Sequence, residues 1–363
     1  MVLMAIDHVR VYSGLPAGGP TPGIFFTRWV THFCAPAFVF FAGTSAYLYG
    51  QRATGLPRFL LTRGLWLIVL ELTVLRIAWT FNTDFGEYNM LGVLWAIGWS
   101  MIVLAALCRL PASVTGAFGV GMIALHHLLP MPEDGASALW KVLYVGFWNG
   151  PFRLGAGGPP VIVLYSLIPW IGIMAAGYAF GRIMTLEPAR RDRLCLVIGL
   201  AATVLFAVLR AGNVYGDPQP WSSTGRMPAL LSFLNTSKYP ASLLFVLMTL
   251  GPAIALVPAL ERARGIAAGW LTLFGRVPFF FYVLHIPLIH ALALAVSALR
   301  EGRVNDWLFA NHPMGAGSAP DGYTWSLPLL YLVWAITLVL LYFACRWFAA
   351  LKARRTDWWL KYL

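Results

Sequence analysis

Residues 274–294 read FGRVPFFFYVLHIPLIHALAL, and this stretch decides the fold. After Arg276 the run is almost wholly apolar apart from His285 and His290. A helix needs about 20 apolar residues to cross the roughly 30 Å hydrocarbon layer of a membrane, where all backbone groups must pair within the chain. The stretch therefore predicts a membrane helix. His285 lies two residues before Pro287, which favours a cavity beside the helix; a core histidine bonded to a carbonyl is the alternative.

Similar apolar runs recur along the whole chain. Of its 363 residues, 59% are hydrophobic and 11% are charged, whereas a soluble domain carries about 25% charged residues. The sequence therefore predicts an all-α polytopic helix bundle that forms one integral membrane domain over residues 1–363. We expect about ten transmembrane segments, near residues 1–13, 29–49, 60–80, 90–108, 112–130, 161–181, 194–211, 239–260, 277–298 and 326–348.

Basic residues predict the orientation of these segments. Arginine and lysine concentrate in the short loops after every second segment, for example at Arg58, Arg109, Arg190, Arg264 and Lys352. Because basic loops stay in the cytoplasm, we expect both termini to be cytoplasmic. The net charge of +12 is explained by this asymmetry, so a nucleic-acid partner is not predicted. The opposite loops are longer and rich in glycine, proline and tryptophan, as functional loops often are.

Ionisable residues within membrane segments are candidates for function. The first segment, MVLMAIDHVR, is short and ends in Asp7, His8 and Arg10. Asp7 and Arg10 are three residues apart and can pair on one helix face. His8 is then either a general base that Asp7 orients or a solvated histidine beside an interfacial ion pair. His32, near the same membrane side, either shares one cavity with His8 or is a structural histidine.

Two further charged residues lie in the third segment. Glu71 and Arg76 are five residues apart, which is a poor spacing for a pair on one helix. A structural clamp with partners on another helix is the favoured interpretation. Motifs for nucleotide hydrolysis, serine hydrolysis and zinc proteolysis are absent from the sequence, and the histidines do not have zinc-ligand spacing. We therefore expect no metal cofactor.

Several stretches carry a family resemblance. The segments LMAIDHVR, FFTRWVTHFCAPAFVFFAGTSAYL, VLWAIGWSMI, LIPWIGIMAAGYAFG, FLNTSKYPASLLFVLMTLGPA and FGRVPFFFYVLHIPLIH resemble bacterial members of the heparan-alpha-glucosaminide N-acetyltransferase family. The resemblance implies an enzyme of the bacterial cytoplasmic (inner) membrane. Such an enzyme takes an acetyl group from cytoplasmic acetyl-CoA, its co-substrate, and transfers it to an amine or hydroxyl of a sugar or glycoconjugate on the external side.

The sequence also departs from the family pattern. The lysosomal branch has its catalytic histidine in the loop after the first segment, but this chain has no histidine between Val9 and Thr31. Either His8 or His32 is therefore expected to take the catalytic role, with Asp7 tuning it, or this subfamily carries out different chemistry. Relatives also have residues upstream of the first helix, so we expect this helix to be truncated at its N-terminus.

The resemblance leads to a set of binding residues. Arg276 and its neighbours would meet the phosphates of acetyl-CoA, and Asn235, Lys238 and Tyr239 would bind the acceptor. The whole predicted binding set comprises Arg10, Arg28, Asn235, Lys238, Tyr239, Arg276 and His285. The alternatives are a proton-coupled secondary transporter of a small solute and a non-catalytic membrane partner in envelope assembly. The sequence leaves open the identity of the acceptor, the length of the acyl chain and whether the protein forms a homo-oligomer.

Overall fold

The computed structural model describes residues 1–17, 21–132, 134–225, 227–313, 319–355, 357 and 360. Each predicted apolar segment contains a helix, so the prediction of a largely helical protein is confirmed. Among the described residues, six helices are long and apolar enough to cross a membrane. These are Pro22–Gly50, Leu167–Met184, Pro188–Gly212, Leu243–Arg262, Pro278–Glu301 and Leu327–Arg354. Ten crossings and two cytoplasmic termini stay predictions.

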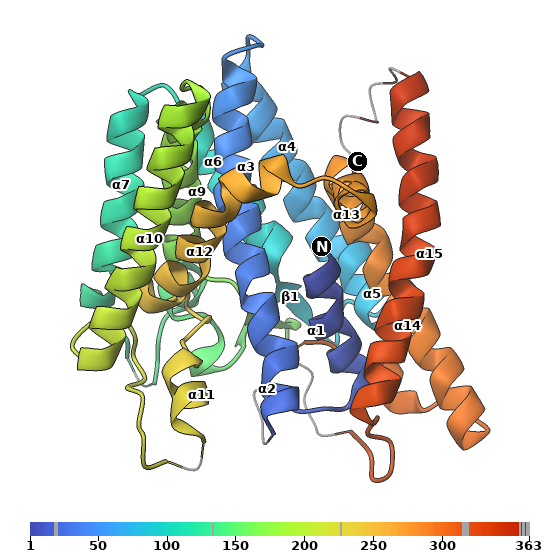
Figure 1. Cartoon of the computed structure of the whole chain (residues 1–363). Coiled ribbons are helices and arrows are strands. Elements are labelled where there is room, and N and C mark those ends of the chain that lie inside the picture. The colour runs from blue at the N-terminus through green and yellow to red at the C-terminus, as the bar shows by residue number, and fades with distance from the viewer. Residues whose placement is uncertain are drawn as a thin grey trace. The chain divides into compact units, whose positions relative to one another are not determined.

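Contacts within the chain group the elements into two compact units, each described here by itself. Unit 1 joins both ends of the chain, Met1–Cys34 and Ala263–Leu363, with the short segment Val74–Asp84. Its helices are α1 (Val2–Ser13), α2 (Pro22–Trp29), η1 (Val30–Phe33), α5 (Arg76–Thr80), α13 (Ile266–Arg276), α14 (Pro278–Glu301), η6 (Asp306–Phe309) and α15 (Leu327–Arg354) (Figure 1). Helix α1 packs against α14 and α15, and α5 packs against α14.

The C-terminal end of α1 is held by the loop before α15. The last four carbonyls of a helix have no partner within the helix. Here Asn311 donates to the Val11 carbonyl at 2.8 Å, and the Tyr323 hydroxyl donates to the Tyr12 carbonyl at 2.9 Å. The Trp325 amide donates to the Ser13 carbonyl at 2.9 Å, and the chain leaves the helix through Gly14 in a left-handed conformation. This loop therefore completes the hydrogen bonding of α1.

Arg76 is a structural clamp inside unit 1. It is almost fully buried, and its guanidinium donates to the carbonyls of Asn82 and Asp84. The prediction of a clamp is confirmed, but these partners lie in the loop after its own helix. The long arginine side chain reaches carbonyls that the turn leaves without hydrogen-bond partners. The spacing between Glu71 and Arg76 gives no indication of these partners.

Unit 2 comprises Ala35–Thr73 and Phe85–Arg262. Its helical elements are α3 (Cys34–Gly50), α4 (Leu56–Leu70), the π-helical turn η2 (Glu71–Leu75), α6 (Val93–Leu107), α7 (Ala112–Leu125), η3 (His126–Leu128), α8 (Ala138–Trp140), η4 (Lys141–Val145), η5 (Gly146–Asn149), α9 (Leu167–Met184), α10 (Pro188–Gly212), α11 (Ala229–Leu234) and α12 (Leu243–Arg262). The most extensive helix contacts described in this unit are those of α10 with α12, α7 with α9 and α4 with α6.

A small sheet in unit 2 departs from the helical prediction. Strands β1 (Asn89–Leu91), β2 (Phe152–Arg153) and β3 (Pro160–Val163) lie in the order β1-β3-β2. Strand β1 is parallel to β3, and β2 is antiparallel to it. The prediction that the segments 90–108 and 161–181 are helical from their first residues is therefore wrong, because these residues lie in β1 and β3. In β3 every second side chain is buried, as is typical of a strand. The buried residues Val161 and Val163 pack with Leu91 in one apolar cluster.

Glu71 is the second predicted clamp, and here a partner on another helix is confirmed. Its buried carboxylate accepts a hydrogen bond of 2.8 Å from the Leu94 amide, in the first turn of α6. A carboxylate at a helix N-terminus satisfies an orphan amide and faces the positive end of the helix dipole. Gly92 permits this approach, because a Cβ atom there would overlap the Glu71 carboxylate.

Close packing inside unit 2 gives a first prediction. A Cβ atom on Gly177 of α9 would overlap the Phe40 carbonyl oxygen of α3, whereas a Cβ atom on Gly121 of α7 would meet nothing within 4 Å. Gly177→Ala is therefore expected to destabilise unit 2 by about 1–3 kcal/mol or more, as overpacking does. Gly121→Ala is the matched control and should be neutral or slightly stabilising. Thermal unfolding in detergent measures both; equal melting temperatures would contradict the described helix contact.

His312 gives a second prediction, on pH. Burial lowers the pKa of His312 to about 4, and the nearby Arg76 acts in the same direction. Between pH 6.5 and 4 the unfolded chain therefore binds a proton that the folded chain does not, so the folded state loses stability as the pH falls. The loss approaches about 1.4 kcal/mol per pH unit. His312→Gln should reduce the slope of unfolding free energy against pH in this range; an unchanged slope would show that His312 does not contribute.

Candidate functional site

Two histidines from opposite ends of the chain meet in unit 1. His8 lies on α1 and His285 on α14, 277 residues later in the sequence, yet His8 Nδ1 is 2.6 Å from His285 Nε2. Their rings stack with centroids 4.8 Å apart. His285 is fully buried, whereas His8 is partly accessible. We call His8 and His285 the histidine pair.

Hydrogen-bond partners assign the protons of the histidine pair. His285 Nδ1 lies 2.6 Å from the Tyr282 carbonyl oxygen. Because a carbonyl can only accept, His285 Nδ1 carries the hydrogen and His285 Nε2 carries a lone pair in the neutral ring. His8 Nδ1 must then donate to His285 Nε2, which leaves the lone pair of neutral His8 on Nε2. The chain of bonds from Tyr282 thus makes His8 Nε2 the proton-accepting atom.

Aromatic side chains surround the histidine pair. The Trp79 ring of α5 meets the His8 ring edge-on at 5.0 Å, and the Tyr12 hydroxyl donates to the Trp79 carbonyl at 2.6 Å. Tyr12 also stacks on the buried His290 at 4.9 Å, and His290 Nδ1 lies 3.3 Å from the Ala78 carbonyl. These contacts fix α1, α5 and α14 around His8. Sequence reasoning missed Tyr12 and Trp79, since nothing in their spacing links them to the histidines.

Asp7 and Arg10 form the ion pair that their spacing predicts. Arg10 Nε donates to Asp7 Oδ1 at 2.8 Å, and Arg10 Nη1 donates to the Leu15 carbonyl at 2.9 Å. The Asp7 side chain is 19% exposed and the Arg10 side chain is 11% exposed. Arg10 thus contacts its own helix and the residues that follow it, and ligand binding by Arg10 stays a prediction. His8 Nδ1 has His285 as a described hydrogen-bond partner, and tuning of His8 by Asp7 stays a prediction.

The other candidate residues of unit 1 lie on different elements. His32 is buried on η1, which packs against α1; a cavity shared with His8 stays a prediction. Arg28 is half-buried on α2, and its carbonyl accepts from the Thr31 hydroxyl at 2.7 Å. Arg276 is exposed at the end of α13, where it lines a surface hollow.

Three predicted acceptor-binding residues come together in unit 2, in the loop between α11 and α12. The Lys238 ammonium lies over the rings of Tyr165 and Tyr239, 5.8 and 5.1 Å from their centroids. Tyr239 also meets the Phe147 ring edge-on at 5.6 Å. The Asn235 carbonyl accepts from Arg210 at 2.8 Å. This loop therefore places one cation within an aromatic cluster.

Arg210 and Asp217 shape this loop, and sequence reasoning missed both. Arg210 is 1% exposed, and its guanidinium also donates to the carbonyls of Phe233 and Gln219 at 3.0 and 2.7 Å. Asp217 lies 3.8 Å from Arg210 and accepts from the Ser242 hydroxyl at 2.7 Å. The available signal was an arginine at the end of an apolar segment followed by an acid in a proline-rich loop.

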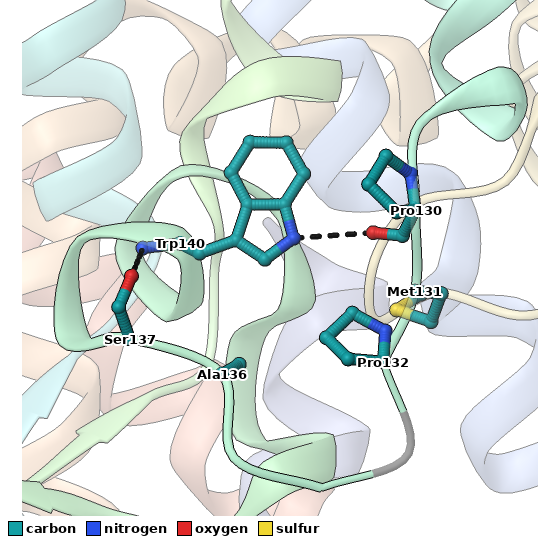
Figure 2. A pocket seen from close by; sticks show the side chains of 6 residues that line it. All are labelled: Pro130, Met131, Pro132, Ala136, Ser137 and Trp140. Carbon is teal, nitrogen blue, oxygen red and sulfur yellow. Dashed lines mark hydrogen bonds between the residues drawn. The ribbon is translucent and has the colours of Figure 1, made fainter.

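A second hollow lies in unit 2, with a volume of about 570 Å³. Figure 2 shows Trp140 facing Pro130 and Pro132, with the Trp140 indole nitrogen donating to the Pro130 carbonyl at 3.1 Å. The Ser137 hydroxyl accepts from the Trp140 amide at 3.2 Å. The lining residues are Pro130, Met131, Pro132, Ala136, Ser137 and Trp140. The described lining residues carry no titratable side chain, so they suit apolar contact.

Comparison with known proteins agrees with the resemblance seen in the sequence. The family model described as heparan-alpha-glucosaminide N-acetyltransferase, catalytic, matches residues 1–212, more than half of the chain. The match includes α1 with His8 and η1 with His32, whereas His285 lies beyond it. No curated protein matches the chain. The chain is a membrane transferase and belongs to the heparan-alpha-glucosaminide N-acetyltransferase family of acyltransferases.

Proposed function

We propose that this protein moves an acetyl group from cytoplasmic acetyl-CoA to an amine or hydroxyl of a sugar or glycoconjugate on the external side of a bacterial cytoplasmic membrane. The observation that carries the proposal is the histidine pair, because it gives a partly accessible His8 one defined basic atom. General-base catalysis needs such an atom near a titratable acceptor.

The chemical step is an acyl transfer with a balanced proton. The acceptor nitrogen or oxygen attacks the thioester carbonyl while His8 Nε2 takes its proton. The new amide or ester bond forms, the carbon–sulfur bond breaks, and the sulfur leaves with the bonding electrons. His8 then returns the proton to the thiolate, so that free CoA leaves as a thiol and the enzyme is regenerated.

His285 has a positioning role in this proposal. Its Nε2 accepts the His8 Nδ1 hydrogen bond, which keeps the lone pair of neutral His8 on the opposite nitrogen. After His8 takes a proton, the same bond becomes charge-assisted and stabilises the imidazolium. A neutral imidazole does this without adding a second charge to a buried site.

The remaining predicted residues keep separate roles in the proposal. Lys238, Tyr239 and Asn235 would bind the acceptor, since the aromatic cluster offers faces for a sugar ring and Lys238 offers a donor. His32 is the rival base. The family match favours an enzyme over a proton-coupled transporter. If the protein were such a transporter, we would expect solute flux without acetyl transfer.

The first functional prediction compares the two candidate bases. His8→Gln should lower kcat by about 10²–10⁴-fold, the usual contribution of a general base, whereas His32→Gln should retain most activity. Acetyl transfer from labelled acetyl-CoA to a glucosamine acceptor in proteoliposomes measures both, with thermal unfolding as the folding control. Loss of activity in the His32 variant alone would move the base to His32, and glucosamine flux without acetylation would sink the enzyme proposal.

The second functional prediction concerns the positioning role. His285→Phe removes the acceptor for His8 Nδ1, so kcat should fall about tenfold or more while KM for acetyl-CoA changes little. His285→Gln is the matched control, because its amide oxygen can accept the same hydrogen bond, and it should recover much of kcat. A rise in KM for acetyl-CoA with kcat preserved would instead make His285 a CoA-binding residue.

A further inference from the structure

A basic hollow lies in unit 1, where the end of α13, the start of α14 and the end of α15 meet. Its volume is about 500 Å³. Its walls include Arg276, Val277, Arg346, Ala349, Lys352 and Ala353. The described lining thus combines basic side chains with alanines, whose small size leaves room beneath the charges.

Charge in this hollow has a single sign. Arg276, Arg346 and Lys352 are exposed, and the described lining residues include no aspartate or glutamate. Guanidinium groups bind phosphate oxygens in a planar, bidentate manner, and an ammonium group adds a point charge. The lining therefore favours an anion with several oxygens.

Helix α14 adds to this field. Val277, in the wall of the hollow, is the residue immediately before the first turn of this helix, which runs for 24 residues. The N-terminus of a helix carries a partial positive charge and unpaired amides, which together favour phosphate. Because Pro278 opens the helix, one of these amides is missing, so the arginines must supply most of the contacts.

Exposed apolar residues on α13 and α15, two of the helices that line the hollow, favour a location at a membrane surface. Helix α13 exposes Ile266, Trp270 and Leu271 at 80%, 56% and 57%, and α15 exposes Trp347 at 62%. In Figure 1, α13 is viewed almost along its axis, whereas α14 and α15 lie roughly in the plane of the picture. Helix α13 therefore crosses the direction of these two helices. An amphipathic helix in this orientation, with exposed tryptophans nearby, is typical of the headgroup layer.

We propose that this hollow binds a phosphate group presented at the membrane surface. Two sources share this chemistry: the headgroup of an anionic phospholipid and the 3′-phosphate of CoA. The second source rests on the proposed function, and the first does not. Either source gives Arg346 and Lys352 a binding role that they share with Arg276.

The experiment compares two double variants from the same end of α15. Arg346→Gln with Lys352→Gln removes two charges from the hollow, whereas Arg354→Gln with Arg355→Gln removes two charges outside it. Native mass spectrometry measures retention of phosphatidylglycerol against phosphatidylcholine. Calorimetry in phosphatidylcholine nanodiscs measures binding of CoA and of 3′-dephospho-CoA.

One of two results supports the proposal. About tenfold weaker phosphatidylglycerol retention in the hollow variant alone identifies a lipid phosphate. About tenfold preference of the wild type for CoA over 3′-dephospho-CoA, lost in the hollow variant alone, identifies the CoA phosphate. If neither quantity differs between the two double variants, the proposal is overturned, even where acetyl transfer persists and the proposed function stands. Should the double variant unfold, Lys352→Gln alone replaces it in both measurements, and Arg346→Lys, which keeps the charge, serves as the control that should retain binding.

Discussion

Polar groups buried among apolar helices must find their partners inside the protein, and this constraint governs the structure. Glu71 meets an amide at the start of α6, and Arg76 meets the carbonyls of the loop that follows it. Arg210 meets carbonyls at the end of α11 and in the loops before and after that helix. Each charged group is matched to backbone atoms that a helix end or a turn leaves without partners. Buried charge and irregular backbone thus stabilise each other.

The histidine pair follows the same rule, with one difference. The Tyr282 carbonyl satisfies His285, and His285 satisfies one nitrogen of His8. The hydrogen-bond order is directional, so it leaves His8 Nε2 as an acceptor on a side chain that is only partly buried. In the proposed mechanism, this atom is the one that takes the proton of the acceptor.

Local features of the fold were predictable from the sequence, whereas long-range contacts were not. Apolar length predicted a helix within each of the ten expected segments, whereas α11 and α13 lie outside them. A spacing of three predicted the Asp7–Arg10 pair. The short sheet was missed because Leu91 and Val161 are apolar residues that fit a helix equally well.

Contacts between distant residues explain what the sequence left open at the candidate site. The sequence singled out His8 and His285 as polar residues in apolar segments, but it assigned them separate roles. Their contact depends on how α1 packs against α14, which a single sequence does not encode in any spacing. The partners of Arg76 were not predicted for the opposite reason. They lie only six and eight residues after it, so the conformation of one turn determines whether their carbonyls face the guanidinium.

The loop that completes α1 has a consequence for biosynthesis. The carbonyls of Val11, Tyr12 and Ser13 receive hydrogen bonds from Asn311, Tyr323 and Trp325, respectively, and Asn311 is synthesised 300 residues after Val11. The helix that carries His8 is therefore synthesised long before the groups that complete its hydrogen bonds. A chain released before Asn311 would lack these bonds as well as α15, so nascent and prematurely terminated products would lack the groups that hold the end of the helix carrying His8.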